Sequence, residues 1–159
     1  MMKYLAIDSC TLNGPLEVLA DSNISMLRLS SVRNLMNIDG LASLNNLSYL
    51  HLSLPKVERL CDFSHMKNLR QLELDYMKSL QEIENLWTAS RLEVLTLKEI
   101  HTRIKAEALD GLTKMECLRQ IDFRFIDTGK GRIAAIRKRM AEAGKSIILI
   151  AKGYGGVLY

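Results

Sequence analysis

The sequence predicts a single-domain α/β solenoid, a right-handed superhelix with one parallel β-sheet of about seven strands on its concave side. Three observations lead to this prediction. A short apolar pattern recurs along nearly the whole chain, with its starts 22 to 26 residues apart. Apolar residues in the intervening segments follow a three-residue step, and the last units add helical patterns. Self-similarity at such a period is typical of repeat folds, in which each unit covers its neighbour.

The recurring pattern has apolar residues at its first, fourth and sixth positions, which predicts one short strand in each unit. Side chains alternate across a strand, so the fourth and sixth residues are expected to point into the core. The third, fifth and seventh residues should then face the concave surface. Crossovers between parallel strands are right-handed by strong default. The pattern starts at Met2, Ile24, Leu47, Leu69, Leu92 and Leu118.

The segments that follow each strand predict a turn-rich or 3₁₀ outer layer. One of them carries Val57, Leu60, Phe63 and Met66 at a regular three-residue step. This step suits a 3₁₀ helix, which has about three residues per turn.

Near the C-terminus the outer segments become helical in pattern. Residues 106–112 are one candidate helix, and residues 132–143 are a better one. Ile133 and Ile136 fall on one face of the second candidate, and Gly144 follows where a C-terminal helix glycine belongs. A short apolar run at residues 147–150 then predicts a last buried strand.

The six tandem copies resemble the leucine-rich repeat, whose consensus is L-x-x-L-x-L-x-x-N/C-x-L. The three-residue step makes them similar to the short bacterial, internalin-like class of this repeat. The resemblance covers about residues 2–151, with a closing helix-strand unit at about 132–151, and it implies one leucine-rich-repeat domain over residues 1–159. The ninth position departs from the family pattern, in which an Asn side chain links successive turns, so we expect looser turns. Cys10 fits the consensus at that position, whereas the other copies hold Val32, Pro55, Met77, Ile100 and Ile126.

The concave surface carries the candidate partner-binding residues. It mixes aromatic side chains with charges of both signs, and Tyr and Arg are the residue types that dominate interface hot spots. We therefore expect another protein to bind this face. The candidates are Tyr4, Arg28, Tyr49, His51, Glu73, Asp75, Tyr76, Lys98, Asp122, Arg124 and Phe125.

Two sets of charged residues on this surface allow two interpretations. Arg28, His51 and Glu73 are successive members of one column across the sheet, and Asp75 and Lys98 begin a similar run in the next column. These charges could pair with one another across neighbouring strands. Alternatively, a partner could intercept them, and Glu73 with Asp75 could receive its Lys or Arg side chain.

The excess of positive charge lies at the C-terminal end. Residues 128–159 hold seven Lys and Arg against one Glu, whereas residues 1–127 hold 15 basic against 17 acidic residues. This segment could be a solvated helix face or a dock for an acidic partner or nucleic acid. Nucleic acid is the less favoured partner, because no aromatic residues interleave with the charges to stack on bases.

Several functional classes lack their sequence signals. No apolar run reaches the ~18 residues of a membrane span, and we expect no membrane association. Three isolated cysteines indicate buried thiols in a reducing, cytoplasmic environment. We expect no enzyme, cofactor or metal, because no nucleophile, phosphate or metal motif is found. A Ser-His-acid set around His51 could be imagined, but an open surface does not exclude water.

The sequence therefore predicts a non-catalytic protein-protein interaction module. A small chain without an effector domain can act by occupying its partner, so a bacterial toxin-neutralising immunity protein is the sharper hypothesis. The alternatives are a scaffold or targeting subunit of a larger assembly, and a nucleic-acid accessory protein that uses the basic C-terminal segment. The first strand has no cap before it, so self-association through its edge is a further expectation.

Overall fold

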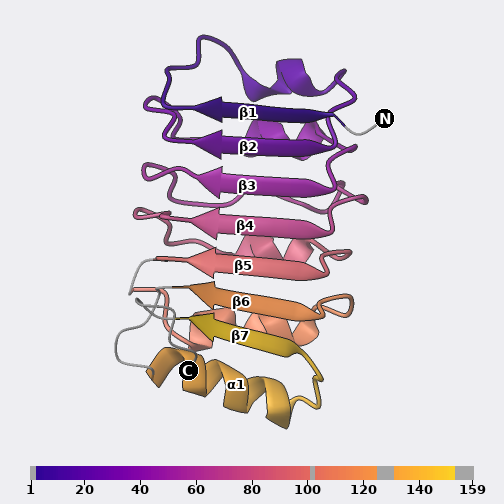
Figure 1. Ribbon diagram of the computed structural model, residues 1–159, viewed down its shortest axis with the longest axis vertical. Coiled ribbons are helices and arrows are strands. Elements are labelled where there is room, and N and C mark those ends of the chain that lie inside the picture. Colours follow the sequence, from indigo (N-terminus) through magenta and orange to yellow (C-terminus); the bar gives the residue numbers. More distant parts are fainter. Residues whose placement is uncertain (1–2, 101–102, 125–130, 153–159) are drawn as a thin grey trace.

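The computed structural model describes residues 3–100, 103–124 and 131–152 of the chain. Within these residues the strands form one parallel sheet of seven members, in which each strand pairs with the next one along the chain (Figure 1). The prediction of a single parallel sheet is confirmed. The strands are β1 Tyr4–Asp8, β2 Met26–Ser30, β3 Tyr49–Ser53, β4 Gln71–Asp75, β5 Val94–Lys98, β6 Gln120–Arg124 and β7 Ile148–Lys152.

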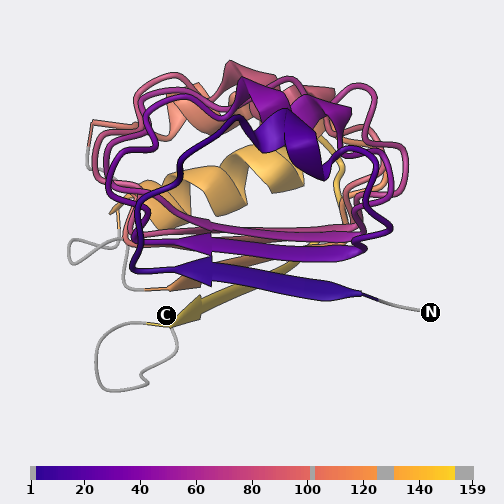
Figure 2. The ribbon, with the colours of Figure 1, turned by 90° about the horizontal axis from the view of Figure 1, so that it is seen from above.

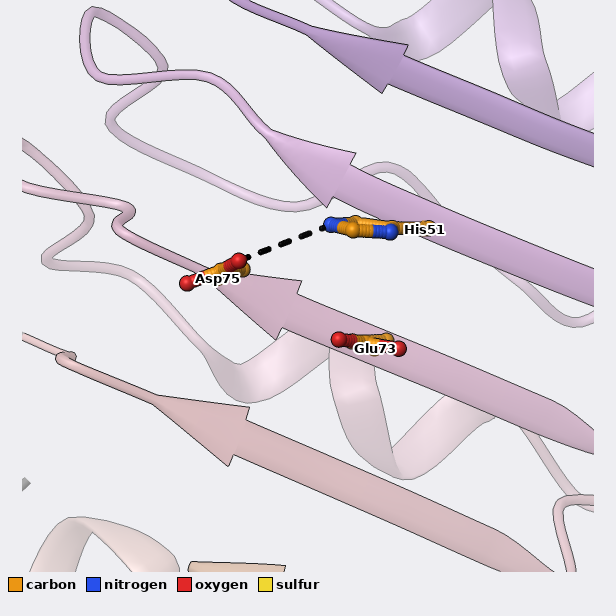
Figure 3. A group of neighbouring side chains, drawn as sticks. All are labelled: His51, Glu73 and Asp75. Carbon is orange, nitrogen blue, oxygen red and sulfur yellow. Dashed lines mark ion pairs between the residues drawn. The ribbon is translucent and has the colours of Figure 1, made fainter. Parts of the chain in front are cut away.

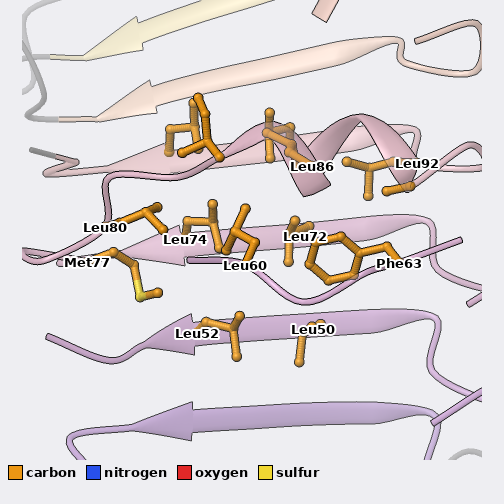
Figure 4. Close-up of a cluster of buried hydrophobic side chains, with 14 of the residues drawn as sticks. Leu50, Leu52, Leu60, Phe63, Leu72, Leu74, Met77, Leu80, Leu86 and Leu92 are labelled. Carbon is orange, nitrogen blue, oxygen red and sulfur yellow. The ribbon is translucent and has the colours of Figure 1, made fainter. Parts of the chain in front are cut away.

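The strands align position for position, so equivalent residues of the repeats lie side by side. Leu50 of β3, for example, pairs with Leu27 of β2 on one side and with Leu72 of β4 on the other. All three side chains are buried, as the alternation of the pattern predicts. Figure 4 shows how such leucines pack with apolar side chains of the returning segments, Leu60 and Phe63 among them.

The returning segments form a second layer that covers only one face of the sheet (Figure 2). Much of this layer is 3₁₀ helix, which agrees with the three-residue step of its buried apolar residues. Between β3 and β4 the described backbone instead forms turns and a single bridge from Arg59 to Glu82. The 3₁₀ helices are η1 Leu16–Leu19, η2 Asp39–Ser43, η3 Glu84–Thr88 and η4 Glu107–Lys114.

The candidate helices near the C-terminus are both present. The first candidate corresponds to the 3₁₀ helix η4, Glu107–Lys114, which begins one residue later than expected, and the second is the α-helix α1, Gly131–Glu142. Ile133 and Ile136 are buried on its inner face, which packs against η4. Gly144 has a φ of 70°, the left-handed conformation expected of a glycine after a helix. No helix in the described residues is long and apolar enough to cross a membrane.

Asparagine side chains do link successive turns, although they lie at other positions than in the family consensus. Asn34 makes two bonds to one residue of the preceding turn: its Nδ2 donates to the Leu12 carbonyl at 2.6 Å, and its Oδ1 accepts from the Leu12 N–H at 3.0 Å. Asn85 Nδ2 donates to the Leu60 carbonyl at 2.8 Å. At the ninth position itself, Val32, Met77 and Ile100 are apolar and buried in the core.

The residue after a strand adopts a left-handed backbone conformation in most of the repeats. Ser9, Ser31, Tyr76 and Glu99 have φ values of 54°, 53°, 53° and 46°. The N–H of Ser31 still donates to the Ser53 carbonyl at 2.9 Å, which extends the ladder past the strand end. Recurrence at equivalent positions identifies this conformation as a part of the repeat rather than as local strain.

Candidate functional site

The face of the sheet opposite the 3₁₀ layer is called the open face here. It carries the side chains of the third, fifth and seventh positions of each repeat, and no described element lies over it (Figure 2). The predicted columns are found in the strand register, since Arg28 pairs with His51, His51 with Glu73, and Thr96 with Asp122.

Glu73 is the centre of a polar cluster on the open face, which we call the central cluster: Tyr49, His51, Glu73, Asp75 and Lys98. The Tyr49 hydroxyl donates to Glu73 Oε2 at 3.1 Å, and the Lys98 ammonium donates to Glu73 Oε1. Burial would raise the pKa of Glu73, but the hydrogen bond from Lys98 and the charges of His51 and Lys98 keep that pKa below its usual value. The cluster therefore holds a carboxylate at neutral pH.

The Glu73 carboxylate also affects the pKa of Tyr49. Burial of the ring and the charge and hydrogen bond of Glu73 raise the pKa of Tyr49 to about 12. Tyr49 is therefore protonated at neutral pH and remains a donor to Glu73. Its half-buried ring still presents a face to solvent near the middle of the sheet.

His51 is the most enclosed member of the central cluster, with an exposed fraction of 8%. Its Nε2 lies 3.8 Å from Asp75 Oδ2 and has no hydrogen-bond partner among the described residues (Figure 3). Burial outweighs the opposing charge of Glu73 and lowers the pKa of His51. The imidazole is therefore neutral at neutral pH. Among the described residues, Nε2 therefore makes no hydrogen bond to Ser30 or Ser53.

In the free chain, charged residues of these columns pair with one another, as the first interpretation expects. Lys98 pairs with Glu73 and not with Asp75, its partner in register, while Asp75 lies against His51. Arg28 Nη2 lies 3.8 Å from Asp8 Oδ2 on the neighbouring strand. The two carboxylates expected to receive a partner's cation thus already face cations or imidazole of this chain.

Two of the predicted binding residues are less accessible to solvent than expected. The exposed fraction of Asp122 is 3%, so the prediction that this side chain is accessible is wrong. Asp122 is short and lies between Thr96 and Ile150 of the flanking strands. The same correction applies to His51, which is enclosed within the central cluster.

Tyr4 and Tyr76 lie at the end and margin of the open face. Tyr4, on the first strand, has 57% of its surface exposed. Tyr76, at 44%, lies in the turn after β4, where the Lys78 ammonium is 4.2 Å from the centre of its ring. The backbone of Arg124 pairs with Lys98 and Lys152, and Phe125 lies outside the described residues.

Sequence reasoning missed a groove of about 430 Å³ near the ends of the first strands. Its lining comes from three successive turns, so only a repeat-by-repeat alignment of the residues that follow each strand could have indicated it. Two of its side chains, Arg33 and Lys56, are cationic. The groove is lined by Ser9, Ser31, Val32, Arg33, Pro55 and Lys56.

The basic C-terminal segment is partly engaged within the chain. Arg139 Nη1 donates to both carboxylate oxygens of Asp110 at 2.7 Å, which joins α1 to η4. Arg132 Nη1 donates to the Ile104 carbonyl at 2.6 Å, and Lys138 Nζ lies 3.8 Å from Glu142. These contacts leave less free charge on α1 than the composition alone suggests.

Comparisons of the chain with models of protein families, with curated proteins and with solved structures found no match. The site is therefore interpreted from its own geometry.

Proposed function

We propose that the chain is a leucine-rich-repeat protein whose right-handed solenoid presents the open face, on its concave side, to another protein. In this proposal the function is binding without catalysis. One observation carries it: the open face bears aromatic and charged side chains, yet every described returning segment covers the opposite face of the sheet (Figure 2). A sheet face this polar can stay uncovered in the free protein and still bind a partner.

The size of the open face supports this function. Seven strands about 4.8 Å apart extend over roughly 30 Å. A partner that covered such a surface could bury about 800 Å² on each side, the area of a standard specific interface. Tyr4 and Tyr49 would supply the aromatic contacts, and Tyr49 is held in place by its bond to Glu73. Ordered aromatic side chains lose little entropy on binding.

The sharper form of the proposal is a bacterial immunity protein that neutralises a toxin by occupying it. The central cluster fits a partner with charges of both signs. Its own Lys98 and Glu73 are paired but remain partly accessible, so a partner's charges could replace this pairing. A scaffold or targeting role would use the same face. A nucleic-acid role through α1 is less favoured, because Arg139 and Arg132 already have partners within the chain.

Affinity purification from the cells that make the protein tests the binding face. We expect wild-type chain to retain one protein partner, and Tyr49→Ala to lose at least about tenfold in affinity, the size of an aromatic hot spot. Val18→Ser on the outer layer, where the side chain is exposed, is the matched control. Equal retention by both variants would mean that the partner does not bind the open face.

The nature of the partner separates the sharper form from its alternatives. If the chain is an immunity protein, its partner should arrest growth when it is expressed alone. The same partner should be harmless when it is expressed together with this chain. A partner without toxicity would favour the scaffold role. Recovery of nucleic acid alone, with binding that falls steeply as salt rises, would overturn the proposal of a protein partner.

A further inference from the structure

The geometry points to a divalent-metal site on the open face, suited to Zn²⁺ and formed by His51, Glu73 and Asp75. Each of these side chains offers one ligand atom, and the three atoms all lie within 4.8 Å of one another. His51 comes from β3, whereas Glu73 and Asp75 come from the same face of β4 (Figure 3). The inference does not depend on the proposed function, because metal binding can be measured without a partner protein.

The state of His51 is the second observation that favours a ligand here. His51 is 8% exposed as a residue and 11% exposed in its side chain, and its Nε2 has no hydrogen-bond partner among the described residues. The 3.8 Å to Asp75 Oδ2 is too long for a hydrogen bond. A buried polar atom without a partner is destabilising, whereas a metal bound to Nε2 would satisfy it. Figure 3 shows that the ring extends toward the Asp75 carboxylate.

The ligand set decides which ion fits. An imidazole nitrogen suits Zn²⁺ and its neighbours in the first transition row, whereas Mg²⁺ and Ca²⁺ take oxygen ligands. Zn²⁺ binds nitrogen and carboxylate oxygen at about 2.0 to 2.2 Å, so its tetrahedral ligands are roughly 3.4 Å apart. The three ligand atoms must therefore move slightly closer together on binding. Rotation of the half-buried Glu73 and Asp75 side chains can bring them closer. Three protein ligands leave a fourth position open.

Two further members of the central cluster would tune the site. The Tyr49 hydroxyl donates to Glu73 Oε2 and orients the carboxylate, as outer-shell donors do at metal sites. The Lys98 ammonium donates to Glu73 Oε1, so it would lie close to an ion bound by the same carboxylate. Because two cations repel at this distance, Lys98 competes with the metal for Glu73. Removal of the Lys98 charge should therefore strengthen metal binding.

Isothermal titration calorimetry with Zn²⁺ tests the site on the full chain. We expect one ion per chain for the wild type and for His65→Ala, the control that removes an exposed histidine outside the cluster. His51→Phe, Glu73→Gln and Asp75→Asn should each weaken binding at least tenfold, since changes in the outer shell alone weaken metal sites by about 10 to 100-fold. Lys98→Met should bind more tightly than the wild type.

Visible absorption of bound Co²⁺ provides a second readout, because it reports coordination directly. The wild type should give a saturating spectrum that Asp75→Asn and His51→Phe lose. The inference is overturned if Zn²⁺ does not saturate the wild type, if His51→Phe binds as well as His65→Ala, or if Mg²⁺ binds as tightly as Zn²⁺. Should His51→Phe fail to fold by circular dichroism, Asp75→Asn and Lys98→Met at the half-buried positions still decide the outcome.

Discussion

Cys61 illustrates at the scale of one residue how position in the repeat controls chemistry. The side chain is fully buried beneath the sheet, whereas Cys10 and Cys117 are half-buried. Burial, with a smaller effect from the charge of Asp39, raises the pKa of the Cys61 thiol to about 12. The reactive thiolate is therefore almost absent at neutral pH.

We predict that Cys61 of the native protein resists alkylation by iodoacetamide at pH 8. The raised pKa leaves far less than 1% of the thiol ionised at that pH, and burial excludes the reagent. Cys10 and Cys117 should be labelled first, as mass spectrometry of timed samples would show. The double variant Cys10→Ser, Cys117→Ser is the control. Fast single labelling of this variant without denaturant would contradict the prediction.

The central cluster shows which residue-level features the sequence could predict. Strand alternation placed Tyr49, Glu73 and Lys98 on the open face, and all three lie there. The register could not say that Lys98 would bond to Glu73 and not to Asp75, because that choice depends on side-chain rotamers. No metal-binding spacing motif was visible either, because the proposed ligand His51 lies on β3, more than twenty residues before Glu73 and Asp75 on β4.

At the scale of elements, packing between outer helices depends on a glycine. Gly111 of η4 lies so close to Trp87 of η3 that an added Cβ would be 2.2 Å from the indole ring. The sequence pattern could not show this contact, because the two residues belong to different repeats. The three-residue step identifies buried positions in each segment, not the distance between segments.

We predict that Gly111→Ala destabilises the protein by about 1 to 3 kcal/mol, the usual cost of overpacking. The new methyl group must push the indole away, and Trp87 can move outward because it is only half-buried. Trp87 is the one tryptophan of the chain, so its fluorescence should shift to longer wavelength as water reaches it. Urea unfolding measures the stability.

The control is Thr113→Ala on the same helix, which removes a hydroxyl that donates to the Asp110 carbonyl. It should leave the fluorescence of Trp87 unchanged. An unshifted spectrum for Gly111→Ala with wild-type stability would show that the η3–η4 contact tolerates a larger residue.

At the scale of the whole molecule, each edge strand of the sheet has a strand neighbour on one side only. Among the described strands, β1 pairs only with β2 and β7 only with β6, while α1 packs on η4 in the outer layer. The inward residues of β1, Leu5 and Ile7, are half-buried, while those of the middle strands are fully buried. Local stability should therefore fall toward the first strand, because that unit has a neighbour on one side only.

Hydrogen exchange measured by mass spectrometry tests this gradient. We expect peptides from β1 to exchange faster than peptides from β3 and β4, whose backbone groups bond to strands on both sides. Repeating the measurement at several protein concentrations distinguishes an open edge from self-association. If a second copy covers β1, the exchange of β1 slows as the protein concentration rises, and the mass measured by sedimentation increases. Slow exchange of β1 at constant monomer mass would contradict the gradient, because an edge strand would then be as stable as the centre of the sheet without any neighbour to hold it.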